Sequence, residues 1–195
     1  MALATYDDLL ATVADWLMRD DLVSAAPVWV RLAEADLNRR LRLTSMVKNA
    51  TVTAIDGAAP LPTDCRQVRT VVSDIGTLSF LPPGQFADFG FMNSGMSPVH
   101  YSVSGHELLA HPGAGDLWIS YYASLPPLGP EQQTNGVLTD HPDLYLFATL
   151  LQSAPYLLDD QRAIVWKTLL DEAIQRAEES DDRAEYAGQL TIRCA

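Results

Sequence analysis

Residues 144–154 have the sequence LYLFATLLQSA, in which nearly every side chain is apolar. A helix that is apolar on most sides is buried on most sides, so this stretch predicts a central helix that other helices must surround. Asp140 or His141 is placed to begin the helix just before Pro142, since proline is favoured in a first turn. Pro155 should kink or interrupt it, because a proline inside a helix removes a hydrogen bond.

Three amphipathic segments are predicted to supply the surrounding helices. The first begins with Thr5 and Asp8, whose spacing is similar to that of a capping box. The second begins near Pro27, and the third opens at Asp159 or Asp160. Their apolar residues fall at helical spacing: Leu9, Leu10, Val13, Trp16 and Leu17 in the first, Val30, Ala33, Leu37 and Leu41 in the second, and Trp166, Leu169, Leu170, Ala173 and Ala177 in the third.

The chain from residue 50 to 125 is built differently, from short β-rich runs that Gly and Pro separate. These runs predict a small antiparallel sheet, and residues 84–95 (GQFADFGFMNSG) fit either a short helix or a loop. The runs are ATVTAI (50–55), RQVRTVVSD (66–74), LSFL (78–81), VHYSV (99–103), ELLAH (107–111) and LWISYYA (117–123).

The predicted fold class is therefore α+β: an antiparallel helical bundle from the N- and C-terminal helices, with an inserted small antiparallel β-rich subdomain. The expected divisions are a helix pair over residues 1–49, the β-rich subdomain over 50–125 and helices completing the bundle over 126–179. Residues 180–195 are expected to form an extended tail, since they contain too few apolar residues for a core of their own.

Composition restricts the possible partners. The 195 residues include 13 Lys and Arg against 25 Asp and Glu, a formal net charge of -12, which argues against free nucleic acid as a general partner. Cys65 and Cys194 form no metal-binding or disulfide-rich pattern, which favours a reducing compartment. The N-terminus lacks the basic flank of a signal peptide, and the longest apolar stretch is too short to cross a bilayer, so we expect a soluble intracellular protein.

The segment HELLAH (106–111) is the main candidate for metal chemistry. Zinc proteases place two histidines four residues apart on a helix, whereas His106 and His111 are five apart. In a strand, that odd separation puts them on opposite faces. The nucleophile and phosphate-binding motifs GxSxG, GxxxxGK[ST] and GxGxxG are also missing. We therefore predict no catalytic residues, no metal, no cofactor and no enzyme.

Arginines are concentrated in residues 27–46, PVWVRLAEADLNRRLRLTSM. Arg31, Arg39, Arg40 and Arg42 have three interpretations: contacts to phosphates, complements to the negative end of the helix dipole, or ion pairs at a subunit interface. The net charge of -12 favours a protein partner over DNA, because the chain itself offers an excess of carboxylates.

Segments over nearly the whole chain resemble the head-to-tail adaptor proteins of tailed bacteriophages. The N-terminal match is to the opening helix pair of that family, and the middle match is to a Leu-Pro-x-Asp entry into a strand and a strand ending in Tyr-Tyr. The C-terminal segments match best. The matching segments are YDDLLATVADWLMRDDL (6–22), PVWVRLAEADLNRRLR (27–42), LPTDCRQVRTV (61–71), LWISYYASLPPL (117–128), TNGVLTDHPDLYLFATLLQSAPYLLDDQRAIVW (134–166) and DDRAEYAGQLTIR (181–193).

This resemblance implies a structural protein of the virion neck, assembled in the host cytoplasm as a ring, usually dodecameric, between the portal and the tail or nozzle proteins. Genomic DNA would pass through the ring during packaging and ejection without sequence-specific binding, and no membrane would be involved. The C-terminal segment of such proteins reaches the portal, which makes Tyr186, Leu190, Ile192 and Arg193 candidate portal-binding residues.

The arginines of residues 27–46 would then contact a neighbouring subunit. The alternative hypothesis is a nucleic-acid-binding regulator that uses Arg39, Arg40 and Arg42.

Overall fold

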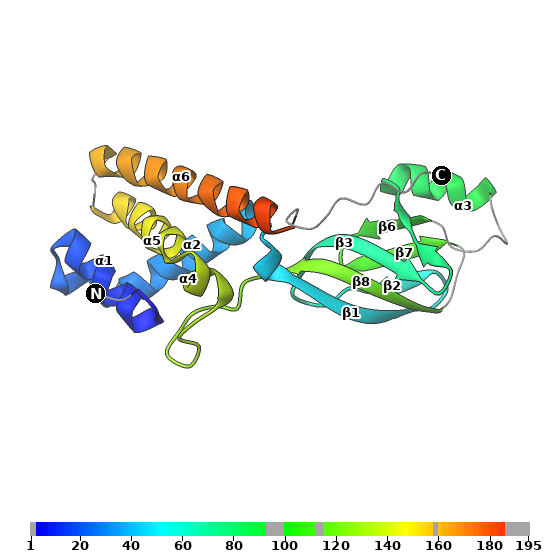
Figure 1. Ribbon diagram of the computed structural model, residues 1–195, viewed down its shortest axis with the longest axis horizontal. Coiled ribbons are helices and arrows are strands. Elements are labelled where there is room, and N and C mark those ends of the chain that lie inside the picture. The colour runs from blue at the N-terminus through cyan, green and yellow to red at the C-terminus, as the bar shows by residue number, and fades with distance from the viewer. Residues whose placement is uncertain (1–2, 93–99, 112–114, 158–159, 186–195) are drawn as a thin grey trace. The chain divides into compact units, whose positions relative to one another are not determined.

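The computed structural model describes residues 3–92, 100–111, 115–157 and 160–185. The chain forms two compact units. The helical unit combines residues 1–46 with residues 125–195, and the β unit consists of residues 47–124. Helices at both ends of the chain and antiparallel sheets between them confirm the α+β class (Figure 1).

The helical unit is organised around α5, the central helix predicted from residues 144–154. α5 packs against α1, α2, α4 and α6, and Leu144, Tyr145 and Leu150 are fully buried. In chain order, the unit contains α1 (Tyr6–Leu17), η1 (Asp20–Leu22), α2 (Ala26–Arg40), η2 (Thr44–Met46), α4 (Gly136–Asp140), α5 (Pro142–Leu157) and α6 (Asp160–Glu185).

The helix starts follow the sequence signals closely. Thr5 and Asp8 form the capping box: the Thr5 hydroxyl accepts a hydrogen bond from Asp8 N at 3.1 Å, and the Asp8 carboxylate accepts one from Thr5 N at 3.1 Å. α2 begins one residue before Pro27. Pro155 does not interrupt α5, which continues to Leu157. A proline in the last turn removes only a hydrogen bond close to the end of the helix, where little structure follows it.

α6 is longer than the sequence suggested. It begins at Asp160 and buries Trp166 and Leu170, but it continues to Glu185. Residues 180–185 are therefore helical, where an extended tail was expected to have begun. The Asp181 carboxylate accepts hydrogen bonds from Thr44 N at 2.9 and 3.0 Å, which holds this end of α6 to η2.

The described residues of the β unit form two four-stranded sheets, where the sequence predicted one small sheet. Their strand orders are β1-β8-β3-β4 and β2-β7-β6-β5. All pairs are antiparallel except β5 with β6. The strands are β1 (Val47–Ala54), β2 (Ala58–Pro60), β3 (Cys65–Ser73), β4 (Gly76–Thr77), β5 (Ser79–Phe80), β6 (His100–Ser104), β7 (Glu107–His111) and β8 (Gly115–Ala123).

The two sheets share one apolar core. Val71 of β3, Leu108 of β7 and Ile119 of β8 are fully buried and belong to the same cluster. A single sheet of these strands would leave that apolar face in water, so a second sheet covers it. The segment that fitted either a helix or a loop forms α3 (Pro83–Met92), which packs near β6.

Along the described parts of the chain, no helix combines the length and apolar character needed to span a membrane.

Ile119→Ala should destabilise the β unit by about 3 kcal/mol, because it removes a fully buried side chain and leaves a cavity. Ile55→Ala is the matched control: Ile55 is 70% exposed, and its loss should change stability by less than about 0.5 kcal/mol. Hydrogen exchange of the β8 amides measures the free energy of opening in each variant. Equal effects of the two substitutions would contradict the placement of Ile119 in the core.

Candidate interaction surfaces

Buried polar side chains hold the loop of residues 125–135 against α2. Glu34 Oε1 accepts a hydrogen bond from Leu128 N at 2.7 Å, and Asn38 Oδ1 accepts one from Leu125 N at 2.8 Å. Glu34 is only 6% exposed. Since the two side chains are four residues apart on α2, they lie on the same face and bind the loop at two points.

Tyr145 and Asn135 complete this arrangement, and we call Glu34, Asn38, Asn135 and Tyr145 the polar cluster. The Tyr145 hydroxyl donates to Glu34 Oε1 at 3.4 Å and accepts from Asn135 Nδ2 at 2.6 Å. Asn135 Oδ1 accepts from Leu138 N at 2.9 Å and so caps α4. Burial raises the pKa of Glu34 above its ordinary value, and burial raises the pKa of Tyr145 as well.

The far end of the loop is fixed to α1. Tyr6 N donates to Gln133 O at 2.7 Å, and Asp7 N donates to Gln133 Oε1 at 3.2 Å. The loop is rich in Pro and Gly, yet hydrogen bonds at both of its ends make it part of the helical unit. Between the loop and Arg31 of α2 lies an open hollow of about 370 Å³.

Sequence reasoning missed the polar cluster. One feature of the sequence could have indicated it: Glu34 and Asn38 adjoin the apolar stripe of α2 and are therefore placed to be buried. That stripe consists of Val30, Ala33 and Leu37. A buried polar group needs a partner, but the partners here lie in a loop far along the chain. That pairing cannot be read from helical spacing.

The structure gives the four predicted interface arginines different surroundings. Arg40 forms ion pairs with Asp171 of α6 and with Asp36 at 3.7 Å. Arg42 Nη1 donates to the carbonyl oxygens of Asn38 and Leu41 at 3.2 and 2.5 Å, so it binds the end of α2.

Arg31 and Arg39 lie at the surface of the helical unit. The side chain of Arg39 is 71% exposed, with one weak ion pair to Asp36 at 3.5 Å. Arg31 is also exposed, beside the loop hollow. These two arginines are therefore the members of the group that are most accessible to another molecule.

Large apolar side chains are exposed near the ends of α1 and α5 and near the starts of α2 and α6. The Trp29 ring packs edge-on against Tyr156 with centroids 5.6 Å apart, although Tyr156 remains 63% exposed. Trp16, expected on the buried stripe of the first helix, is 47% exposed and contacts Phe147. Other large apolar side chains exposed on these segments are Met18, Val23, Val28, Ile164 and Val165.

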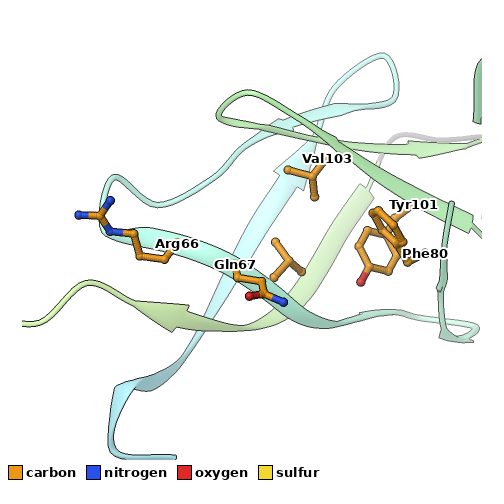
Figure 2. Close-up of a pocket in the computed structure, with 6 residues that line it drawn as sticks. Arg66, Gln67, Phe80, Tyr101 and Val103 are labelled. Atoms are coloured by element: carbon orange, nitrogen blue, oxygen red, sulfur yellow. The ribbon is translucent and has the colours of Figure 1, made fainter. Parts of the chain in front are cut away.

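The β unit contains a hollow of about 290 Å³ between strands of its two sheets. Figure 2 shows Val103 and Tyr101 on one side of it and Arg66 and Gln67 on another, with Phe80 beside Tyr101. A smaller hollow of about 210 Å³ shares Arg66, Gln67 and Val103 and reaches His106. Burial raises the pKa of the nearby Cys65 thiol, which keeps the thiol protonated.

The remaining sequence candidates are separated from one another. His106 lies in the turn before β7, and His111 is the last residue of β7. Within the described ranges, no group of three or more His, Cys, Asp or Glu residues is placed to hold a metal ion. The candidate portal-binding residues Tyr186, Leu190, Ile192 and Arg193 lie outside the described residues.

The Glu34 carboxyl makes the stability of the helical unit depend on pH. Because the pKa of Glu34 is raised in the folded state, the folded chain holds this proton more tightly than the unfolded chain does. The stability of the unit therefore falls as the pH rises through the range in which Glu34 loses its proton. Glu34→Gln keeps an acceptor for Leu128 N and removes the charge. The variant should therefore be more stable relative to wild type at about pH 7 than at about pH 4.

Glu34→Ala is the companion variant, and it should lose about 2 kcal/mol, because it leaves Leu128 N and the Tyr145 hydroxyl without this acceptor. Urea unfolding followed by far-ultraviolet circular dichroism measures both variants. A stability difference between wild type and Glu34→Gln that is the same at both pH values would show that the carboxyl does not titrate as the structure indicates.

Comparison with known proteins supplies the identity of the family. Residues 4–193 match a family model described as SU10 adaptor protein, so the match includes nearly all of both units. A search of curated proteins finds no match. Since the family match covers far more than half of the chain, this protein belongs to the SU10 adaptor protein family and is a structural adaptor protein of a bacteriophage.

Proposed function

We propose that this chain forms a ring between the portal and the tail of a phage particle and that the ring continues the DNA channel. The observation that carries the proposal is the family match over residues 4–193, which includes the helical unit, the β unit and most of the C-terminal segment. The proposed ring is dodecameric and assembles in the host cytoplasm before it becomes part of the virion neck.

The charge of the chain supports passage of DNA without binding. The formal net charge is -12, and a ring of identical subunits multiplies that charge around its axis. A negatively charged surface repels the phosphates of a duplex, so an acidic bore would let DNA pass without binding it. Arg40 and Arg42 are bonded within their own helical unit, which leaves fewer cations for phosphates.

Neighbouring subunits would meet through opposite charges. Arg31 and Arg39 are exposed on α2, whereas the exposed face of α6 carries Glu172, Glu178 and Asp182. Charge pairs across an interface favour the correct partner and raise the rate of association. We therefore propose that Arg31 and Arg39 of one subunit lie near the acidic face of α6 in the next subunit.

Reversing both charges, with Arg31→Glu and Arg39→Glu, should weaken ring assembly on the portal about tenfold or more, because like charges then face each other. Arg19→Glu together with Arg69→Glu is the matched control, since both arginines are exposed, lie outside α2 and α6, and change the net charge by the same amount. Assembly measured by sedimentation at increasing salt would show the difference. Equal weakening by the control would point to net charge, not to the α2 arginines, as the determinant.

The C-terminal segment is proposed to dock on the portal through Tyr186, Leu190, Ile192 and Arg193. Deleting residues 186–195 removes this segment and leaves all of α6 in place. The truncated chain should keep its folded helical unit, as judged by circular dichroism, and should fail to form a ring on the cognate portal in electron micrographs. A normal ring made by the truncated chain would remove the segment from the docking mechanism.

A further inference from the structure

Among its described residues, the β unit is closed on one side and open on the other. On the closed side, the turn between β1 and β2 links the two sheets, with Ile55 and Ala58 forming a bridge. On the opposite side, β3 and β6 belong to different sheets, and β4 and β5 cover their edges only in part. β4 pairs with β3 only at Val72 and Ser73, and β5 pairs with β6 only at the first two residues of that strand. We call the opening between β3 and β6 the seam.

The hollow of about 290 Å³ lies in this seam. Its apolar wall consists of Val68 from β3, Tyr101 and Val103 from β6, and Phe80 from β5. Phe80 remains 54% exposed while its ring packs edge-on against Tyr101, with centroids 5.5 Å apart. An accessible aromatic pair of this kind can bury a further apolar side chain at low conformational cost.

The other end of the seam is positively charged. Arg66 lines both hollows, and in Figure 2 its guanidinium points away from the apolar wall. Within the described part of the chain, Arg66 makes no hydrogen bond or ion pair with another side chain. Its charge is therefore available to a carboxylate from outside, at a fixed place beside the edge of β3.

We propose that the seam binds an extended segment of another protein of the virion, which adds as a strand along the edge of β3 or β6. One apolar side chain of that segment fills the hollow beside Tyr101 and Phe80, and an acidic side chain pairs with Arg66. Only the source of the segment rests on the proposed adaptor function. Strand addition gives affinity through main-chain hydrogen bonds and specificity through the pockets for alternate side chains.

The irregular edge of β3 makes this binding selective. The register of β3 against β8 shifts between Cys65 and Gln67 and again between Val68 and Thr70. Bulges and charged residues at an edge discourage pairing with arbitrary strands. A segment that brings a carboxylate to Arg66 neutralises the positive charge of that guanidinium at the strand edge, whereas a basic or neutral segment does not.

Photo-cross-linking in assembled phage particles tests the proposal. The full chain carries His106→p-benzoylphenylalanine, because His106 is exposed beside the seam without lining the larger hollow. The expected product joins this position to a segment of a virion protein in which an Asp or Glu lies within a few residues of an aliphatic or aromatic residue. Thr51→p-benzoylphenylalanine, on exposed β1, should not give the same product. No cross-link at His106, or one to a helical segment, overturns the proposal.

A synthetic peptide with the cross-linked sequence is then titrated against the free full-length chain. Arg66→Glu should weaken binding about tenfold, and Val103→Glu should weaken it at least as much, because a charge then occupies the hollow. Arg19→Glu is the matched control: Arg19 is an exposed arginine of the helical unit that pairs with Asp21, and affinity should be unchanged. Since Arg66 is exposed, its variant remains informative even if Val103→Glu unfolds the β unit.

Binding that is insensitive to Arg66→Glu would overturn the proposed recognition. If the peptide binds as expected but the chain forms no ring on the portal, the adaptor ring is wrong and the seam inference stands. If the ring forms but the peptide does not bind, the seam inference alone fails.

Discussion

The buried carboxylate of Glu34 accepts a hydrogen bond from the main chain of Leu128, 94 residues further along the chain. This bond connects α2, which precedes the β unit in the sequence, to the loop that follows the β unit. Asn38 adds a second bond to Leu125, and Tyr145 of the central helix joins the same carboxylate. The two halves of the helical unit, which the β unit separates in sequence, are thus joined by polar contacts as well as by packing.

Burying the Glu34 carboxyl costs free energy. Burial of Glu34 raises its pKa, so the charged form is disfavoured in the folded state. An apolar residue at this position would avoid that penalty but would leave Leu128 N without its acceptor. The main contribution of the buried carboxylate is therefore specificity and not stability. It holds the loop in one position on α2, which a purely apolar contact would not do.

An adaptor must present surfaces that larger assemblies recognise, and the two units offer different kinds. The helical unit has exposed arginines on α2, an acidic face on α6 and exposed apolar side chains near several helix ends. The β unit has a seam whose apolar wall and single arginine suit an extended segment. Charge complementarity suits the proposed contacts between identical subunits, because each copy carries both signs, whereas the seam suits the proposed segment of a different chain.

The sequence by itself determined the local structure, because capping, periodicity and β-rich runs depend on near neighbours. Thr5 with Asp8 predicted the start of α1, residues 144–154 predicted the central helix, and the short β-rich runs predicted most strands. The tertiary structure alone decided that the strands form two sheets, that Asp181 holds α6 to Thr44, and that Arg40 pairs with Asp171. Each of these depends on residues far apart in the chain, whose pairing no local pattern encodes. The seam belongs to the same class, since it exists only where β3 and β6 come together without pairing.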